Sequence, residues 1–277
     1  MERIKEALER ARQQREASAG SVAAAPARQP SPRRVQARAP DSLEIEYTQT
    51  RIISPDPVVM REKRVVSSSR GDAVADAYRM LRTRVIRAMK EQGWNSLAIT
   101  SPRTGEGKSL TAVNLALSMA REVDRTVLLV DLDMRRPSTH EFFGFEVEQG
   151  LSDYLSGDVE LADLLVNPAV ERFVVLPGRG RVENSSELLG SPKMEQLSQE
   201  IAARYPERIV IYDLPPVLAV DDALAFSPQV DAFLLVVEEG ETQAEEILAA
   251  HDVLAQANIL GTVLNKSTES QSNYYYY

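Results

Sequence analysis

The pattern of apolar and polar residues changes near residue 71. Before that point apolar positions are sparse. A narrow apolar stripe with helical spacing predicts a short amphipathic helix over residues 1–16. The following stretch is rich in Ala, Pro and Arg, and its later apolar pieces are separated by Pro55 and Pro57. Because this pattern has no period that could bury a face, it predicts a largely disordered linker over residues 17–70.

From residue 71 onward, strand-like and helix-like patterns alternate. The apolar runs VLLV, IVIY and FLLVV are continuous, which is typical of strands covered on both faces. The sequence therefore predicts an α/β fold over residues 71–267, with a parallel β-sheet flanked by helices. We expect strands at 96–100, 126–131, 172–176, 208–213, 231–237 and 259–264, and helices near 72–92, 108–122, 151–166, 192–204, 220–227 and 242–257.

Composition removes several classes of function. The chain of 277 residues has no cysteine and two histidines, which excludes disulfides, thiolate metal sites and a His-rich zinc site. The longest apolar runs are far shorter than the roughly 20 residues that a membrane span needs. The net charge is −9, although residues 1–40 are basic. Because the remainder is acidic, we expect no nucleic-acid surface. The basic segment predicts either a solvated tail or a contact with anionic lipid or an acidic partner.

A glycine-containing loop follows the first strand of the predicted domain. It reads SPRTGEGKS, ends at Lys108 and Ser109, and directly precedes a predicted helix. Backbone N–H groups of such a loop wrap a triphosphate, and the helix N-terminus adds a favourable dipole. Lys108 would bridge the β- and γ-phosphates, and Ser109 would ligate Mg²⁺. Proline stands at position 102 where the usual pattern has glycine, so the sequence predicts a variant phosphate loop; the alternative is a plain glycine-rich turn.

Carboxylates stand at the ends of two further strands. Asp131 and Asp133 end one strand, and Asp213 ends another. Carboxylates at the end of a buried strand are costly unless a cation pairs with them, and a magnesium nucleotide would supply that cation. The alternative is a solvated turn in which Arg135 and Arg136 neutralise the first two aspartates.

Together these motifs resemble the bacterial tyrosine kinases that control capsule and exopolysaccharide synthesis. That family belongs to the deviant phosphate-loop class, which also contains partition and cell-division ATPases. TSPRTGEGKS resembles its Walker A loop, LLVDLDMRRP its Walker A′ motif and IVIYDLPPVL its Walker B motif. The resemblance covers about residues 72–277. The N-terminal part more weakly resembles the subset tied to exosortase-associated polysaccharide loci.

The resemblance implies a deviant P-loop NTPase-like fold with ATP and Mg²⁺ as cofactors. Asp131 is the implied residue that accepts or orients the proton of the tyrosine hydroxyl, and Asn265 would read the adenine edge. Arg103 stands where the partition ATPases carry a signature lysine. The implied catalytic residues are Lys108, Asp131, Asp133 and Asp213, and the implied metal ligands are Ser109, Asp131, Asp133 and Asp213. The implied ATP-binding residues are Arg103, Thr104, Gly105, Glu106, Gly107, Lys108, Ser109, Leu110 and Asn265.

The predicted helix over 72–92 resembles the self-association helix of the family, whose pattern is Glu-x-x-Arg-x-x-Arg. Asp76 replaces the glutamate, and Arg79 and Arg82 match the two arginines. The resemblance implies a ring-like homo-oligomer. The alternative is that Arg79, Arg82, Arg84 and Arg87 form a solvated basic face.

The sequence ends in four consecutive tyrosines after a polar stretch. Tyr274, Tyr275, Tyr276 and Tyr277 are nearly half of the nine tyrosines in the chain. Exposed consecutive aromatic residues have no packing role and favour aggregation, so a merely low-complexity end explains them poorly. We predict a flexible tail over residues 268–277, and the resemblance implies that its tyrosines are the phosphoacceptors.

The implied activity is an ATP-dependent tyrosine autokinase that phosphorylates this tail in trans and regulates capsule or exopolysaccharide synthesis and export. Two alternatives stay open: a partition-type ATPase that switches dimerisation, and a non-catalytic nucleotide-binding adaptor. The implied partners are the chain itself, a membrane-bound chain-length regulator (a polysaccharide co-polymerase) as activator, and a tyrosine phosphatase. We expect a cytoplasmic location with peripheral association with the inner membrane through a partner.

Overall fold

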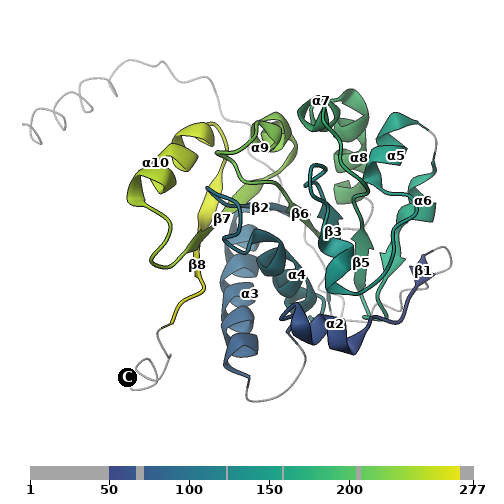
Figure 1. The fold of residues 1–277 in the computed structure, drawn as a ribbon, viewed down its shortest axis with the longest axis horizontal. Helices are drawn as coiled ribbons and strands as arrows, with labels where there is room; N and C mark the ends of the chain where they lie inside the picture. The colour runs from purple at the N-terminus through teal and green to yellow at the C-terminus, as the bar shows by residue number, and fades with distance from the viewer. Residues whose placement is uncertain (1–49, 67–71, 123, 158, 204–206, 269–277) are drawn as a thin grey trace, which may run out of the picture. The chain divides into compact units, whose positions relative to one another are not determined.

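An eight-stranded sheet lies between two layers of helices (Figure 1). The computed structural model describes residues 50–66, 72–122, 124–157, 159–203 and 207–268. The helix predicted over 1–16, the linker before residue 50 and the tyrosine tail lie outside the described residues.

The continuous apolar runs form the middle of the sheet. The strand order is β1-β4-β5-β3-β6-β2-β7-β8, and among the described strands only β4 and β5 pair antiparallel. The central strands are buried along nearly all of their length because helices cover both faces. The prediction of a mostly parallel sheet is confirmed. The strands are β1 (Arg51–Ile52), β2 (Ser96–Thr100), β3 (Thr126–Asp131), β4 (Val166–Asn167), β5 (Phe173–Leu176), β6 (Arg208–Asp213), β7 (Ala232–Glu238) and β8 (Ile259–Asn265).

One face of the sheet is covered by the long helix α3 and its neighbour α4. Val85 and Met89 of α3 and Leu115 and Met119 of α4 are buried in one apolar cluster against the sheet. Gly93, with φ of 75°, ends α3 in the left-handed conformation that glycine adopts without strain. The helices of this layer are α2 (Pro57–Glu62), α3 (Ala73–Gln92), α4 (Lys108–Met119) and the 3-10 helix η1 (Thr139–Phe142).

The remaining helices contribute to a second apolar cluster on the opposite face. Leu197 of α8, Phe226 of α9 and Ala250 of α10 are buried there against Val210 and Tyr212 of β6. The helices are α5 (Leu151–Ser156), α6 (Leu161–Leu164), α7 (Ser185–Leu189), α8 (Pro192–Ala203), α9 (Asp222–Phe226), the 3-10 helix η2 (Ser227–Gln229) and α10 (Ala244–Val253).

The single helix predicted near 151–166 is wrong. Gly157, with φ of 110°, ends α5 in a left-handed cap, and α6 is a separate short helix. The chain then continues into β4 at Val166, which pairs antiparallel with β5. A glycine that favours a helix C-cap therefore divides a pattern that otherwise has helical spacing.

Residues 50–66 differ from the predicted disordered linker because they fold onto the sheet unit. Asp56 caps α2 by accepting hydrogen bonds from the backbone N–H groups of Val58 and Val59 at 2.8 and 3.3 Å. Pro57 occupies the first turn of this helix, where its missing N–H costs nothing. The proline that favoured a linker therefore helps to start a helix, and β1 pairs with β4 at the edge of the sheet.

Candidate active site

Three strand ends meet at the centre of the sheet. The strands β3, β6 and β2 are consecutive neighbours, and Asp131 lies opposite Asp213 in the β3–β6 register. Because these strands are parallel, their carboxyl ends lie on the same edge, where open α/β sheets bind ligands. The loop before α4 therefore lies beside both carboxylate-bearing strand ends.

The loop from Ser101 to Gly107 is held in shape by its own polar groups. Gly105 and Gly107 have φ of 93° and 91°, which other residues adopt only with strain. The backbone N–H of Arg103 donates to Glu106 Oε2 at 2.8 Å, and Ser101 Oγ donates to the Arg103 carbonyl at 2.7 Å. Helix α4 starts directly after the loop, and no described side chain caps its N-terminus. Its first N–H groups are therefore open to an anion.

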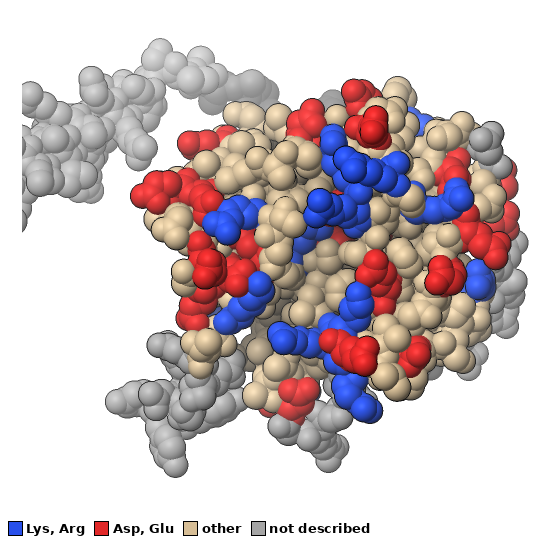
Figure 2. Space-filling view, viewed as in Figure 1, with Lys and Arg blue, Asp and Glu red and all other residues tan. Residues whose placement is uncertain are grey.

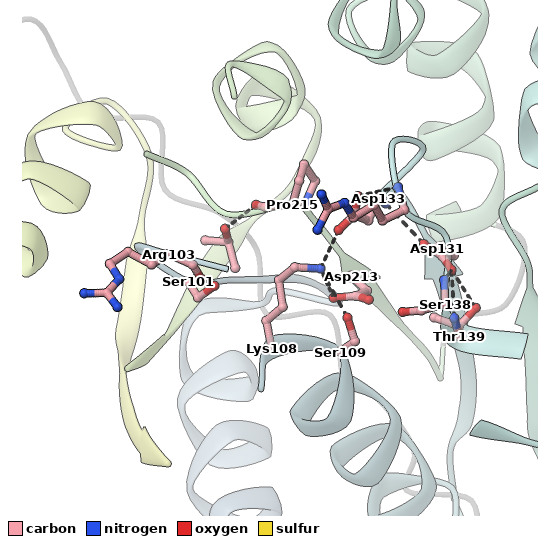
Figure 3. Close-up of polar contacts among 12 residues, drawn as sticks. Ser101, Arg103, Lys108, Ser109, Asp131, Asp133, Ser138, Thr139, Asp213 and Pro215 are labelled. Atoms are coloured by element: carbon pink, nitrogen blue, oxygen red, sulfur yellow. Dashed lines mark hydrogen bonds and ion pairs between the residues drawn. The ribbon is translucent and has the colours of Figure 1, made fainter. Parts of the chain in front are cut away.

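Lys108 is the cation that pairs the strand-end carboxylates. Its Nζ lies 2.8 Å from Asp133 Oδ2, 3.4 Å from Asp213 Oδ1 and 3.2 Å from Ser109 Oγ (Figure 3). The lysine side chain is only 11% exposed. Burial lowers its pKa, but the charges of Asp213 and Asp133 outweigh this and raise the pKa above its ordinary value. Lys108 therefore stays protonated, and Arg135 and Arg136 do not take this pairing role.

Asp131 is fully buried, and its carboxylate is bound by the loop that follows β3. Oδ2 accepts hydrogen bonds of 2.9 Å each from the backbone N–H groups of Ser138 and Thr139 and from the Thr139 hydroxyl. Oδ1 accepts from the backbone N–H of Asp133 at 3.2 Å. Burial, and then the nearby charge of Asp213, raise the pKa of Asp131 to about 7. Figure 3 shows this group directed toward Ser138 and Thr139, whereas Asp133 faces Lys108.

The predicted metal ligands are only partly brought together. Ser109, Asp133 and Asp213 converge on Lys108 Nζ, while Asp131 is bound elsewhere. Burial raises the pKa of Asp213, and its Oδ2 has no hydrogen-bond partner among the described residues. Among the residues that the structure describes, no group of three or more Asp, Glu, His or Cys side chains could hold a metal ion without further ligands.

This donor set fits a magnesium ion that arrives with a nucleotide. Mg²⁺ is usually bound by one or two carboxylates together with waters and substrate phosphates, rather than by a cage of protein ligands. An unpartnered buried carboxylate oxygen on Asp213 and a hydroxyl on Ser109 are ligands or water-binding groups of the required kind.

Asn265 contacts the loop backbone directly. Its side-chain amide donates to the Glu106 carbonyl at 2.8 Å, and a Cβ at Gly107 would lie 2.1 Å from the same amide nitrogen. Glu106 is itself buried, and its Oε1 accepts a hydrogen bond from the Thr242 hydroxyl. The structure thus gives Asn265 a bracing role at the phosphate loop, which the sequence did not predict, and adds Thr242, which no motif marked.

Arg103 extends away from Lys108. Its Nη1 lies 3.4 Å from Glu246 Oε1 on α10, and the arginine side chain is 47% exposed (Figure 3). Thr104 lies within the loop, and Leu110 lies in the first turn of α4. The guanidinium therefore does not face the strand-end carboxylates of its own chain.

A pocket of about 260 Å³ opens beside Lys108 and Asp133. Its lining combines basic side chains with small and proline residues that follow β6. Figure 2 shows basic side chains gathered between α7 and α9 on the viewed face. The sequence did not mark Arg181 as a site residue. The lining residues are Thr104, Lys108, Asp133, Arg135, Arg136, Arg181, Pro215, Pro216, Ala219 and Val220.

The predicted oligomerisation residues are paired within the chain. Arg79 forms an ion pair with Asp76 one turn earlier in α3. Arg82 donates to the Ser118 carbonyl at 3.1 Å, and its Nη2 lies 3.1 Å from Glu122 Oε1. Arg82 thus joins α3 to the end of α4, while Asp76 and Arg79 remain partly exposed on α3. The predicted acceptors Tyr274–Tyr277 lie outside the described residues.

Comparisons with known proteins decide the family. The CobQ/CobB/MinD/ParA nucleotide binding domain matches residues 97–275. The chain is 35% identical over 206 residues to the tyrosine-protein kinase YwqD of Bacillus subtilis, a match that covers 73% of this chain and 86% of that protein. The chain belongs to the bacterial tyrosine kinases. The resemblance seen in the three motifs is confirmed.

Solved structures agree with this family. The kinase domain of the Escherichia coli tyrosine kinase ETK matches with a TM-score of 0.68 and 33% identity, over 82% of this chain and 92% of that structure. The septum site-determining protein MinD from Pyrococcus horikoshii matches at 24% identity with a TM-score of 0.54, which shows the shared fold alone. The partition-type alternative is therefore the more distant relationship. Among the described residues, no helix has both the length and the apolar character of a membrane span.

Proposed function

We propose that this bacterial tyrosine kinase transfers the terminal phosphate of ATP, with Mg²⁺, to Tyr274–Tyr277 of a neighbouring copy. The observation that carries the proposal is the convergence of Lys108, Asp133 and Asp213 beside the uncapped N-terminus of α4. Cations and backbone N–H groups at one edge of the sheet suit a triphosphate. The open pocket next to them leaves room for an acceptor side chain.

The site residues would bind the triphosphate and Mg²⁺ and position them for transfer. In-line phosphoryl transfer needs mainly alignment and charge neutralisation. Lys108 would exchange its carboxylate partners for phosphate oxygens, while Ser109, Asp133 and Asp213 would hold Mg²⁺ or its waters. Bound Mg²⁺ would supply further neutralisation of the phosphate charge. The predicted ATP-binding loop, Arg103 to Leu110, would surround the triphosphate.

The two Walker A′ aspartates have different surroundings. Asp133 lines the pocket and is the carboxylate that would face an acceptor hydroxyl bound there. The hydroxyl has an ordinary pKa near 10, so a nearby carboxylate would help by orienting it or accepting its proton. Asp131 remains a candidate for that role only if its loop moves, because its oxygens accept hydrogen bonds from Ser138, Thr139 and Asp133. In this conformation it orders the loop.

The wider assignment rests on family membership. The relatives are named tyrosine-protein kinases, and we propose for this chain a ring-like homo-oligomer that acts in capsule or exopolysaccharide synthesis and export. A membrane-bound chain-length regulator would activate it, and a tyrosine phosphatase would reverse the modification. This arrangement would place the kinase at the cytoplasmic side of the inner membrane through its partner.

Incubation of the full chain with labelled ATP and Mg²⁺, followed by mapping of phosphotyrosine, tests the proposal. We expect label on the tail of the wild type and none on K108M, because the variant lacks the cation at the phosphate site. K63M is the matched control, because it removes a lysine that lies outside the phosphate loop and the strand ends. Lys63 forms an exposed ion pair with Glu141. Release of free phosphate without labelled tyrosine would instead indicate an ATPase, and neither product would indicate an adaptor.

A further inference from the structure

The phosphate loop contains a buried acid. Glu106 stands between Gly105 and Gly107 and is only 2% exposed. A carboxylate repels the phosphates of a nucleotide, and this repulsion is strong where protein excludes water. The loop can therefore surround a triphosphate only if the charge of this acid is directed away from the phosphates and compensated by hydrogen-bond donors.

The two oxygens of this carboxylate are bound from different parts of the chain. The backbone N–H of Arg103, in the loop itself, donates to Glu106 Oε2 at 2.8 Å. The hydroxyl of Thr242, in the turn between β7 and α10, donates to Glu106 Oε1. Glu106 is not among the residues that line the pocket beside Lys108. The acid thus points toward the β7–α10 turn rather than into that pocket.

The β7–α10 turn gives the Thr242 hydroxyl a fixed direction. The backbone N–H of Glu238 donates to Thr242 Oγ1 at 2.8 Å, and the Thr242 N–H donates to the Glu238 carbonyl at 3.1 Å. The Glu239 N–H donates to the Asn265 carbonyl at 3.0 Å, which joins the turn to the end of β8. Because Thr242 Oγ1 accepts from Glu238, its own proton is free to be donated to Glu106.

Other contacts between this part of the fold and the loop act on different groups. The side-chain amide of Asn265 donates to the Glu106 carbonyl at 2.8 Å and leaves the carboxylate untouched. Arg103 Nη1 lies 3.4 Å from Glu246 Oε1, but the arginine is about half exposed, and exposed ion pairs contribute little. The contact of Thr242 is therefore the one that controls where the acid of the loop points.

We propose that Thr242 is a positioning residue for the nucleotide, which acts through Glu106 to keep the phosphate loop in the form that binds a triphosphate. The inference rests on the ATP binding of the proposed function and is independent of which residue accepts the phosphate. Without the Thr242 hydroxyl, the carboxylate loses a donor and is free to turn toward the phosphates.

Nucleotide binding by the full chain tests the proposal. The probe is a fluorescent, non-hydrolysable ATP analogue with Mg²⁺, titrated against each protein. We expect T242V to bind it about ten times more weakly than the wild type, because a hydrogen bond to a charged group is lost. T242S keeps the hydroxyl and should restore binding to within about twofold of the wild type. T262V is the matched control, since Thr262 is exposed on β8, and it should bind as the wild type does.

A double variant shows whether Thr242 acts through the acid. E106Q has no carboxylate that could repel the phosphates. Adding T242V to E106Q should therefore weaken binding by less than about twofold, compared with about tenfold in the wild-type background. A full tenfold loss in the E106Q background, or an equal loss in T262V, would overturn the inference.

Hydrogen exchange measures the loop without any nucleotide. In T242V the backbone amides of residues 101–107 should exchange faster than in the wild type, while exchange in the central strands stays the same. T242S should exchange as the wild type does. Equal exchange of the loop in T242V and the wild type would show that Thr242 does not hold it, and would contradict the proposal.

Labelling of the tail by the same proteins separates this inference from the proposed function. If the wild type forms phosphotyrosine and T242V binds the analogue equally well, the positioning role fails and the kinase function stands. If binding depends on Thr242 but no phosphotyrosine forms, the kinase function fails and the positioning role stands. If the wild type does not bind the analogue, both fail.

Discussion

A single buried carboxylate, Asp131, organises the loop that follows β3. Three hydrogen bonds of 2.9 Å reach its Oδ2 from Ser138 and Thr139. A carboxylate in an apolar interior costs free energy unless such donors compensate for lost water. Its pKa of about 7, raised by burial and by Asp213, shows that compensation is incomplete near neutral pH.

T139V tests this balance between burial and hydrogen bonding. The Thr139 hydroxyl favours the ionised form of Asp131, so its loss raises the pKa of that carboxyl further. We expect the free energy of unfolding to fall by about 2 kcal/mol at pH 8, where a hydrogen bond to a charged group is lost. Below pH 6 the carboxyl holds its proton in the folded state, so the loss shrinks to roughly 1 kcal/mol or less.

Guanidinium denaturation in buffer without nucleotide or magnesium measures both values. S138A is the control, because Ser138 donates to Asp131 through its backbone and keeps that bond. An equal loss of stability for T139V at both pH values would show that the hydroxyl does not act on the charge.

Residue types and their spacing predicted that Lys108, Asp133 and Asp213 lie at one site, but not their exact contacts. Lys108, Asp133 and Asp213 follow apolar strands, so their motifs place them at strand ends. The order of strands in the sheet, which brings those ends together, is not written in any one motif. Arg181 and Thr242 could not be predicted, because they reach the site from loops that only the fold brings near.

At the scale of elements, the end of the segment over residues 50–66 is hydrogen-bonded to the side chain of Asn114 on α4. Asn114 Oδ1 accepts from the Val66 N–H at 2.8 Å, and its Nδ2 donates to the Arg64 carbonyl at 3.2 Å. Val65 between them is buried in the cluster under α3 and α4. A short segment that could not fold alone is thus ordered by tertiary contacts.

N114A should weaken this attachment. The change leaves a backbone donor on Val66 and an acceptor on Arg64 without their partner, which we expect to cost about 2 kcal/mol in the free energy of unfolding. Urea denaturation and proteolysis at residues 50–66 measure it. K63A is the control, since the exposed pair between Lys63 and Glu141 should contribute about 1 kcal/mol or less. A stability loss in N114A no larger than in K63A would contradict this account.

Element prediction succeeded where hydrophobic patterns were long. The strands β2, β3 and β6 and the helix α3 were predicted within about a residue because each has an extended apolar run or period. The two-residue strands β1 and β4 and the five-residue helix α7 are too short to show a period, and their order comes from packing. Pro55 and Pro57 favour a linker in the sequence pattern, whereas in the structure Pro57 lies in the first turn of α2.

At the scale of the whole molecule, α3 serves two purposes at different positions. Arg82 lies only 17% exposed between α3 and α4, whereas Asp76 and Arg79 have side chains 42% and 37% exposed. The bonds that the mostly buried Arg82 makes to α4 stabilise the fold. The exposed pair of Asp76 and Arg79 can instead exchange its partners for those of a neighbouring copy. The proposed ring contact therefore depends on Asp76 and Arg79 more than on Arg82.

Paired variants separate these purposes. We expect D76A/R79A to lower the assembled mass, measured by light scattering after size exclusion, without changing the free energy of unfolding. R82A should lower that free energy by about 1–2 kcal/mol, because it loses its bonds to Ser118 and Glu122. If D76A/R79A keeps the mass of the wild type, α3 does not form the contact through these residues.

Asn265 braces the phosphate loop at the end of β8, and the chain stays bound to the domain as far as Thr268, whose N–H donates to Glu239 Oε2 at 2.8 Å. Six peptide steps separate Thr268 from Tyr274, and a fully stretched leash of that length reaches about 20 Å. A neighbour's pocket must lie inside that radius to be served. Shortening the leash by a few residues at a time would therefore act as a molecular ruler for the spacing of subunits in the assembly.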